Sequence, residues 1–417
     1  MKLRPHQERV CYDARKILDV HGVVLLALEP RVGKTLCALT LASEIEGRCL
    51  FVTKKAAMSS IVADSEAMGK LYGRLDVINY ESLHKVKFGG YSAVVIDECH
   101  RLSAPKKPCK AARQIRGICA GASRVVLLSG TPAIETSAQW FNIFWATARG
   151  PWVRFGSGIM AFYSWFKAGG YGIPSPIRIA GGIEVESYKR VILRVADEVK
   201  PYAICMTQSD IGFKQSAKVI EHLVNDPLAV EIGARIKKEG IVHIGFQTVL
   251  AENPAAILQK QAMICGGSVL DEDGNVALTG STAKMDYLVS RLTKGKQYAI
   301  FTQYIAERDM LMVFLSSHGF AVTDDMEAFK AGEFMVFVGS IKRYSEGVDL
   351  SFIDGSMVLY SLTFSGSTYV QILERMNNMN RTAPIKIHVL MVKDSIEPSI
   401  FKAVSQKKNF NEAFLNA

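Results

Sequence analysis

The stretch Glu29-Pro30-Arg31-Val32-Gly33-Lys34-Thr35 decides the predicted fold. An apolar run over residues 23–28 precedes it and predicts a strand, and a helical pattern over residues 34–45 follows it. Strand, tight loop, Gly-Lys-Thr and helix form the layout of a phosphate-binding loop, because N–H groups of the loop and of the helix N-terminus hold phosphate oxygens. We expect Lys34 to reach the β- and γ-phosphates and the Thr35 hydroxyl to bind Mg²⁺. The residues expected around the phosphates are Pro30, Arg31, Val32, Gly33, Lys34 and Thr35.

A second motif, Asp97-Glu98-Cys99-His100, ends another apolar run over residues 93–96. We expect Asp97 to hold the same Mg²⁺ and Glu98 to orient or polarise the attacking water, so Lys34, Asp97 and Glu98 are the predicted catalytic residues of this part of the chain. Ligands of parallel sheets bind at the carboxyl ends of the strands, where both carboxylates are predicted to lie. The two motifs in this order indicate a nucleoside-triphosphate hydrolase.

Composition narrows the class of protein further. The chain has 417 residues, of which 49% are hydrophobic and 22% charged, so we expect a packed globular protein of two to three domain-sized parts. A net charge of +10 favours a polyanionic partner, most simply nucleic acid. The eight cysteines form no Cys-x-x-Cys pair and predict reduced thiols without a zinc site. No apolar run approaches the ~18 residues that span a membrane, and we expect a cytoplasmic protein.

The order of predicted elements gives the architecture. Strands and helices alternate up to about residue 150 and again after residue 281, which predicts two α/β lobes with parallel sheets. Between them, residues 151–280 predict a mostly helical insertion and a linker, in which an aromatic-rich part forms a core. The predicted domains are therefore residues 1–150, 151–280 and 281–417. Only the first lobe carries a phosphate loop, so we expect the nucleotide between the lobes and hydrolysis coupled to their closure.

In order along nearly the whole chain, these motifs resemble those of superfamily 2 helicases and translocases, and within them the Swi/Snf-type group. Leu3-Arg4-Pro5-His6-Gln7 looks like the motif whose glutamine reads adenine, which implies ATP and a role for Gln7. Leu128-Ser129-Gly130-Thr131-Pro132 has the form typical of duplex-DNA translocases. The resemblance implies two tandem RecA-like lobes. The short chain is similar to helicases encoded by bacteriophages, which implies the cytoplasm of a bacterial host.

The resemblance also implies roles for residues outside the phosphate loop. Those implied to couple the ATP and nucleic-acid sites are His100, Ser129, Thr131 and Gln371. Those implied to contact nucleic acid are Thr53, Lys54, Lys55, Tyr80, Thr302, Gln303, Ser340 and Lys342. In the second lobe Gly347 and Asp349 match a nucleotide-contacting motif. The family's catalytic arginine lies seven residues after the glutamine at Gln371, where this chain has Asn378, so the arginine finger is either Arg375 or Arg381.

The sequence therefore predicts an ATP- and Mg²⁺-dependent DNA helicase or translocase acting on duplex, forked or branched DNA. A protein partner in replication or recombination is possible. Three alternatives stay open at this point. One is an RNA helicase or a remodeller of RNA–DNA hybrids. Another is a nucleic-acid-binding regulatory protein with a weak ATPase, which Asn378 suggests. The third is a motor that works only with a partner protein.

Overall fold

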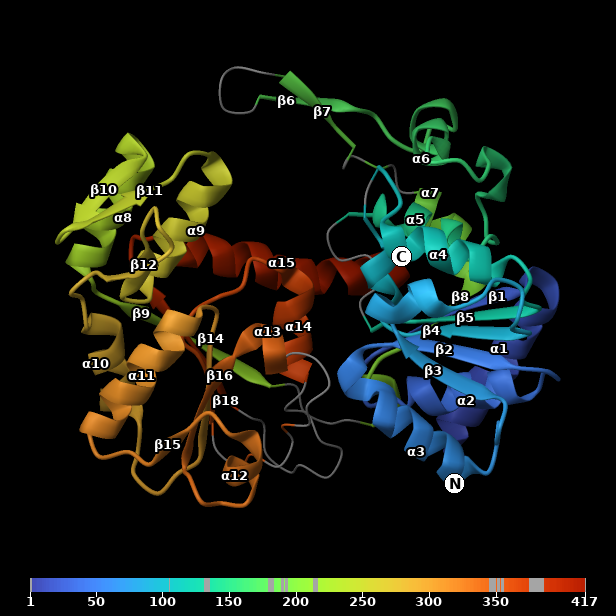
Figure 1. The fold of residues 1–417 in the computed structure, drawn as a ribbon, viewed down its shortest axis with the longest axis horizontal. Helices are drawn as coiled ribbons and strands as arrows, with labels where there is room; N and C mark the ends of the chain where they lie inside the picture. The colour runs from blue at the N-terminus through green and yellow to red at the C-terminus, as the bar shows by residue number, and fades with distance from the viewer. Residues whose placement is uncertain are drawn as a thin grey trace. The chain divides into compact units, whose positions relative to one another are not determined.

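The chain divides into two compact units, one of Met1–Gly212 with Asn409–Ala417 and one of Phe213–Lys408. Figure 1 shows the fold in a computed structural model. The structure describes residues 2–104, 106–130, 136–178, 184–188, 191, 194–212, 217–344, 350, 353, 356–374 and 386–416. Each unit is built around its own six-stranded sheet.

The first unit has a sheet in which every neighbouring pair of strands is parallel. Its strand order is β3-β2-β4-β5-β1-β8. The strands are β1 (Val23–Leu28), β2 (Cys49–Thr53), β3 (Leu75–Asn79), β4 (Ala93–Ile96), β5 (Arg124–Leu128) and β8 (Ala203–Met206). Strands β1 and β4 lie where the apolar runs over residues 23–28 and 93–96 predict them, whereas β8 joins the edge of the sheet from far along the chain.

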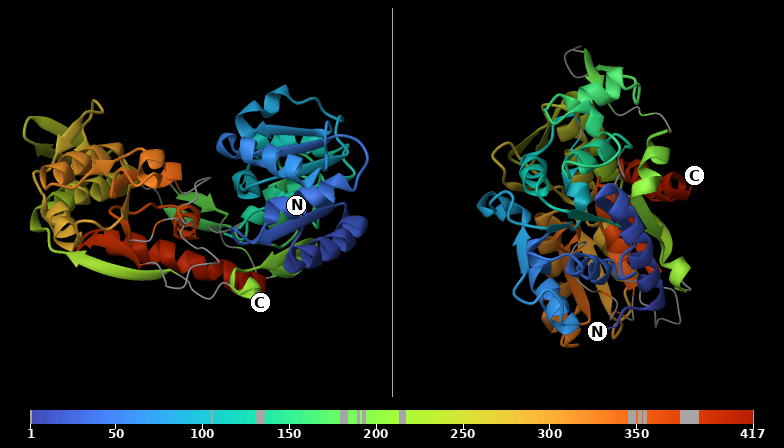
Figure 2. Two further views of the ribbon diagram at one scale, coloured as in Figure 1. Left: turned by 90° about the horizontal axis from the view of Figure 1, so that it is seen from below. Right: turned by 90° about the vertical axis from the view of Figure 1, so that its right-hand side faces the viewer.

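Helices cover both faces of this sheet, as Figures 1 and 2 show. Along β1, alternate residues enter different cores: Leu25 packs with one side and Leu26 with the other, because successive side chains of a strand point to opposite faces. One core includes α1 (Pro5–His21), α2 (Lys34–Ser43) and α3 (Met58–Met68). The other includes α4 (Lys110–Cys119), α5 (Gln139–Trp145) and α7 (Arg194–Val199). The first unit is therefore a three-layer α/β fold.

The aromatic-rich part after residue 150 belongs to this second core. Trp152, Phe162, Trp165 and Tyr171 are all buried, and the ring centroids of Phe141 and Trp165 lie 5.0 Å apart. The segment contains α6 (Ala161–Tyr163), a π-helical turn (Ser164–Ala168) and the antiparallel pair β6 (Ser175–Arg178) and β7 (Glu184–Ser187). These aromatic residues are buried in a core, as predicted, but this core belongs to the first unit and not to a separate insertion.

The second unit repeats the parallel arrangement with strand order β15-β16-β14-β17-β18-β9. Its strands are β9 (Lys218–Val224), β14 (Tyr298–Thr302), β15 (Val322–Thr323), β16 (Val336–Ser340), β17 (Ser356–Leu359) and β18 (Lys386–Val392). Core residues come on one face from α10 (Ala283–Arg291) and α11 (Ile305–Ser317). On the other face they come from α12 (Met326–Lys330), α13 (Ile341–Tyr344), α14 (Gly366–Glu374) and α15 (Glu397–Asn416).

A smaller cluster lies within the second unit beside this sheet. Helices α8 (Pro227–Glu239) and α9 (Pro254–Cys265) pack with two antiparallel hairpins around a core of their own. The hairpins are β10 (Ile241–Ile244) with β11 (Gln247–Leu250), and β12 (Ser268–Leu270) with β13 (Val276–Leu278).

The two α/β lobes predicted from the sequence are confirmed, but the segment between them differs from its prediction. Residues 151–280 carry the strands β6 to β13 in addition to helices, and the chain divides inside this segment, at Gly212. Its strand β8 completes the first sheet and its strand β9 completes the second. The predicted mostly helical insertion is therefore a mixed segment of helices and strands, and it contributes to both units.

Candidate nucleotide-binding site

The predicted phosphate loop connects β1 to α2, so the expected strand–loop–helix layout is present. Gly33 caps α2 with φ of 99°, a left-handed conformation that favours glycine. A Cβ atom at this position would also lie 1.9 Å from Gln7 Nε2, so a larger residue would displace that side chain. Lys34 and Thr35 begin the helix, whose first N–H groups have no partner within the helix and are available to phosphate oxygens.

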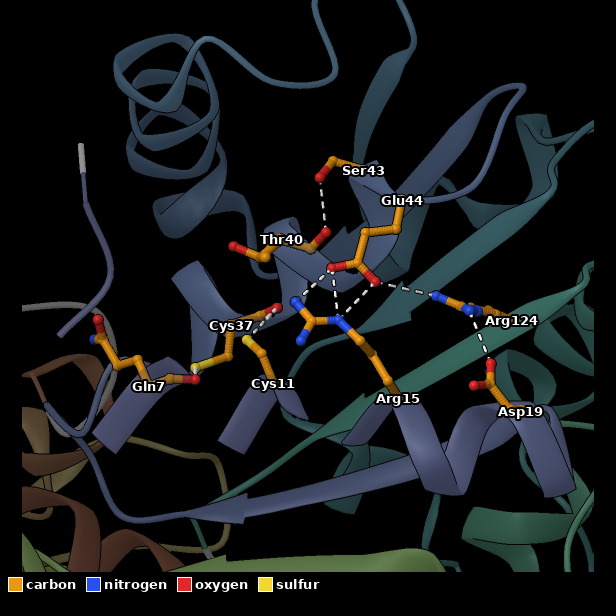
Figure 3. A network of polar contacts seen from close by, with 9 residues as sticks. All are labelled: Gln7, Cys11, Arg15, Asp19, Cys37, Thr40, Ser43, Glu44 and Arg124. Atoms are coloured by element: carbon orange, nitrogen blue, oxygen red, sulfur yellow. Dashed lines mark hydrogen bonds and ion pairs between the residues drawn. The ribbon is translucent and has the colours of Figure 1, made fainter. Parts of the chain in front are cut away.

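Gln7 lies against the loop from α1. Its Nε2 donates to the Val32 carbonyl at 3.3 Å, and its Oε1 accepts from the Arg4 backbone N–H at 2.8 Å. Figure 3 shows how α1 is fastened to the phosphate-loop helix: Arg15 pairs with Glu44, just after α2, at 2.8 Å. The residue predicted to read adenine is therefore held beside the phosphate loop by its own helix.

Two buried carboxylates follow β4. Thr53 Oγ1 donates to Asp97 Oδ2 at 2.8 Å, and the Glu98 backbone N–H donates to Asp97 Oδ1 at 3.0 Å. Tyr80 fixes the turn by donating from its hydroxyl to the Asp97 carbonyl at 2.5 Å. Burial raises the pKa of the Asp97 carboxyl above its usual range, and the charge of Lys34 opposes this shift.

A series of polar contacts through Glu98 and His100 joins side chains of three motifs. Lys34 Nζ lies 3.5 Å from Glu98 Oε1, and His100 Nδ1 lies 3.3 Å from Glu98 Oε2. The same His100 nitrogen lies 3.2 Å from Ser129 Oγ, beyond the end of β5. Two of the residues implied to couple the ATP and nucleic-acid sites, His100 and Ser129, are therefore in contact. The carboxylate that would orient water is linked to the phosphate loop on one side and to the Ser129 motif on the other.

The donor set near the loop fits Mg²⁺. A hydroxyl at Thr35 and a carboxylate at Asp97 are the hard oxygen ligands that this ion prefers, and it usually takes only one or two carboxylates besides phosphate oxygens. Among the residues that the structure describes, no group of three or more His, Cys, Asp or Glu side chains forms a metal cage. Thr35 and Asp97 therefore offer the kind of oxygen atoms that would hold such an ion beside bound phosphates.

Two residues predicted to contact nucleic acid in the first unit have side chains turned inward. Thr53 has no exposed surface and bonds to Asp97, and Tyr80 is 7% exposed, with Arg101 over its ring at 4.8 Å. In this structure both side chains bond to Asp97, and a contact of either residue with nucleic acid stays a prediction. Lys54 is half-buried and its charge lowers the pKa of Asp97, whereas Lys55 is exposed at the start of a 3₁₀ turn.

In the second unit the corresponding residues lie at the carboxyl ends of the strands. Thr302 ends β14 and its side chain is fully buried, so its predicted contact with nucleic acid stays a prediction. Gln303 follows it, and its backbone N–H donates to Ser361 Oγ at 2.7 Å. Ser340 pairs with Thr302 in register and is half-buried, and Lys342 is exposed on α13. Gln371, the predicted coupling residue, is 6% exposed on α14.

Several predicted site residues lie outside the described part of the chain. They are Thr131, Gly347, Asp349, Arg375 and Arg381. Their assigned roles stay predictions. Asn378, which stands where the family has its catalytic arginine, also lies outside the described residues.

Sequence reasoning missed two residues that touch the loop. Gln208, two residues after β8, is buried and donates from Nε2 to the Pro30 carbonyl at 2.9 Å. Gly130 leaves little room beside the loop, since a Cβ atom there would lie 3.1 Å from Pro30 Cδ. The partners Gln208 and Pro30 are 178 residues apart, so no local pattern could have paired them.

Comparison with known proteins agrees with this architecture. No model of a protein family matches the chain, and the curated proteins include no significant match. Among solved structures, the chain is similar to the crystal structure of the Hef helicase domain of Pyrococcus furiosus, with a TM-score of 0.52 and 13% sequence identity. The likeness covers 97% of this chain and 98% of that chain. The chain therefore has the two-lobed, RecA-like fold of a helicase domain. No helix in the described residues is long and apolar enough to cross a membrane.

Proposed function

We propose that the chain is an ATP-dependent DNA helicase or translocase that couples ATP hydrolysis to movement along duplex, forked or branched DNA. The observation that carries this proposal is the contact series from Lys34 through Glu98 and His100 to Ser129. A phosphate-binding lysine, a water-orienting carboxylate and a residue that reaches a third motif are joined within 3.5 Å at each step. The helicase-domain fold supports the same class of activity.

The chemistry assigned to each residue follows from its position. The N–H groups at the start of α2 and the ammonium of Lys34 bind the phosphates, and Gln7 contacts adenine. Thr35 and Asp97 would hold Mg²⁺, which would supply neutralisation of charge on the phosphates. Glu98 orients the water that attacks the γ-phosphorus. Arg375 or Arg381 stabilises the charge that develops on the transferring group, worth roughly 10³–10⁵ in rate in enzymes with such an arginine.

His100 and Ser129 carry the proposed coupling. His100 contacts the carboxylate that would orient water and, through the same nitrogen, the hydroxyl of Ser129. A shift of the Ser129 segment on binding nucleic acid would therefore change the position of His100 and then that of Glu98. Thr131 and Gln371 belong to the same proposed coupling set, by resemblance.

DNA is proposed as the partner on two grounds. The net charge of +10 supports a polyanion, and the Ser129-Gly130-Thr131-Pro132 motif resembles that of duplex-DNA translocases of the Swi/Snf-type group. Exposed Lys55 and Lys342 are proposed phosphate contacts, together with Lys54, Gln303 and Ser340. A phage origin, a bacterial cytoplasm and a protein partner in replication or recombination are proposed on the resemblance alone.

ATP hydrolysis measured with different nucleic acids tests this proposal. Duplex DNA, forked DNA, single-stranded DNA and RNA are compared at matched nucleotide concentration, with Lys34→Ala as the inactive control. We expect strong stimulation by duplex or forked DNA, and DNA affinity that falls as salt rises, because Lys and Arg contacts release counterions. Stimulation by RNA alone would replace DNA with RNA or an RNA–DNA hybrid as the substrate. Turnover that no nucleic acid stimulates would point to a regulatory or partner-dependent protein.

A further inference from the structure

The segment that leaves the first unit is bonded to the phosphate loop. After β8 the chain runs through residues 207–212, here termed the connector, and the second unit begins at Phe213. The Gln208 backbone N–H donates to Glu29 Oε2 at 2.7 Å, and Gln208 Nε2 donates to the Pro30 carbonyl at 2.9 Å. One residue of the connector thus binds two successive residues of the loop.

The strand before the connector strengthens this link. β8 pairs in parallel with β1 from Ala203 opposite Leu25 to Met206 opposite Leu28. The pairing continues into the loop, because the Glu29 backbone N–H donates to the Met206 carbonyl at 3.0 Å. The loop and the connector therefore leave the sheet side by side and are joined by hydrogen bonds of 2.7 to 3.0 Å.

The phosphate loop is held from two sides. On one side His6 Nε2 lies 3.0 Å from the Val32 carbonyl, close to the Gln7 contact described above. On the other side Gln208 holds Pro30. Between these contacts Arg31 has φ of 69°, a conformation that costs a non-glycine residue energy unless its surroundings maintain it. Contacts from α1 and from the connector therefore hold the loop on two sides.

Burial makes the connector contact costly to lose. Gln208 is 7% exposed, and a buried amide or carboxylate that loses its partner costs about 1–3 kcal/mol. Its neighbour Ser209 is exposed, and its hydroxyl bonds within the connector, to Thr207 Oγ1 at 2.8 Å. Only Gln208 of these two residues is bonded to the loop, so the pair offers a matched comparison.

We propose that Gln208 and Glu29 form a latch that transmits the nucleotide state of the phosphate loop to the connector, and through it to the second unit. This inference rests on the proposed function, because it assumes that the loop binds ATP. Gln208 is a positioning residue, which acts through Pro30 and Glu29. Phosphate binding at the start of α2 draws the loop into one conformation, and the latch orders the connector with it.

Hydrogen exchange measured by mass spectrometry tests the latch directly, because the Gln208 N–H is one of its donors. The peptide covering β8 and the connector is followed with and without ATPγS and Mg²⁺ in the full chain, in Gln208→Ala and in Ser209→Ala. We expect nucleotide to slow exchange in this peptide about fivefold, the factor given by one hydrogen bond of about 1 kcal/mol. The effect should weaken in Gln208→Ala, which loses the Nε2 bond to Pro30 but keeps the backbone N–H bond to Glu29, and should persist in full in Ser209→Ala. Glu29→Gln, which keeps the side-chain size, should weaken it and serves if Gln208→Ala does not fold.

Steady-state kinetics separate a latch from a merely structural contact. In Gln208→Ala, DNA-stimulated kcat should fall about fivefold while KM for ATP stays unchanged, because the loop still binds nucleotide. A raised KM with unchanged kcat would contradict transmission and assign Gln208 to holding the loop. Connector exchange that is the same with and without bound nucleotide would overturn the latch alone. A chain that binds no nucleotide would overturn both the latch and the proposed function.

Discussion

Replacing Thr53 by valine should impair ATP hydrolysis by acting on Asp97. The Thr53 hydroxyl donates to Asp97 Oδ2 at 2.8 Å, and Thr53 has no exposed surface. Valine keeps nearly the same shape but offers no donor. Asp97 Oδ1 would still accept from the Glu98 backbone N–H, at 3.0 Å. Asp97 Oδ2 would lose its hydrogen bond from residue 53, in a site that is largely buried.

The size of the effect follows from the charge on the acceptor. A hydrogen bond to a charged group contributes about 1.5–3 kcal/mol, and each 1.4 kcal/mol is a factor of ten, so turnover should fall by roughly 10- to 100-fold at neutral pH. The Thr53 bond lowers the pKa of Asp97 against the effect of burial, so its loss raises that pKa further. A larger share of Asp97 is then protonated and unable to bind Mg²⁺, and activity should recover as pH or Mg²⁺ concentration rises.

The assay is steady-state ATP hydrolysis from pH 6 to about 9 over a range of Mg²⁺ concentrations. Thr53→Ser is the control, since it keeps the hydroxyl and should stay close to wild type. Affinity for DNA without nucleotide should not change in either variant, because Thr53 is buried. Wild-type turnover by Thr53→Val at every pH would refute the role assigned to this hydrogen bond. A loss of DNA affinity with normal basal turnover would restore Thr53 as a nucleic-acid contact.

Three further predictions concern single side chains. Glu98→Gln should still bind ATP, but its rate of hydrolysis should fall about 10²-fold or more. Nucleotide binding and turnover are measured on the same variant, and a loss of ATP binding would show that Glu98 has a structural role instead. His100→Ala should lower the ratio of DNA-stimulated to basal turnover, and an unchanged ratio would remove His100 from the coupling series. In the second unit, burial raises the pKa of Glu307 to about 7 from its ordinary 4.5. The folded protein therefore favours the protonated form of Glu307. The contribution of this group to the free energy of unfolding is complete below pH 4.5 and is lost as pH rises through 7. Glu307→Gln should therefore raise the free energy of unfolding by up to about 3 kcal/mol at pH 8 and by little at pH 5. Urea denaturation at the two pH values measures this difference. An equal effect of the substitution at both pH values would show that Glu307 does not titrate in this way.

Local sequence predicted the elements of the first sheet because their signals are short-range. The apolar run of β1, the glycine at residue 33 and the helical pattern after it are consecutive, and the structure places them as expected. The same holds for β4 with its two carboxylates. The resemblance implied that His100 and Ser129 act together, and their side chains lie 3.2 Å apart.

The failures share a different physical origin. Strand β8 belongs to the first sheet through pairing with β1, and β9 joins the second sheet through pairing with β18, contacts that no local periodicity encodes. For Thr53 and Tyr80, the motif gives the position of each residue but not the direction of its side chain. Both side chains point to the acidic turn after β4, where their hydroxyls satisfy buried oxygens.

Movement along DNA is the central claim, and displacement of a third strand from a DNA triplex tests it most directly. The chain is loaded on the duplex beside the triplex, ATP and Mg²⁺ are added, and release of the third strand is followed in wild type and in Lys34→Ala. The account predicts ATP-dependent displacement by wild type only. ATP hydrolysis at full DNA-stimulated rate without any displacement would contradict coupling of hydrolysis to movement.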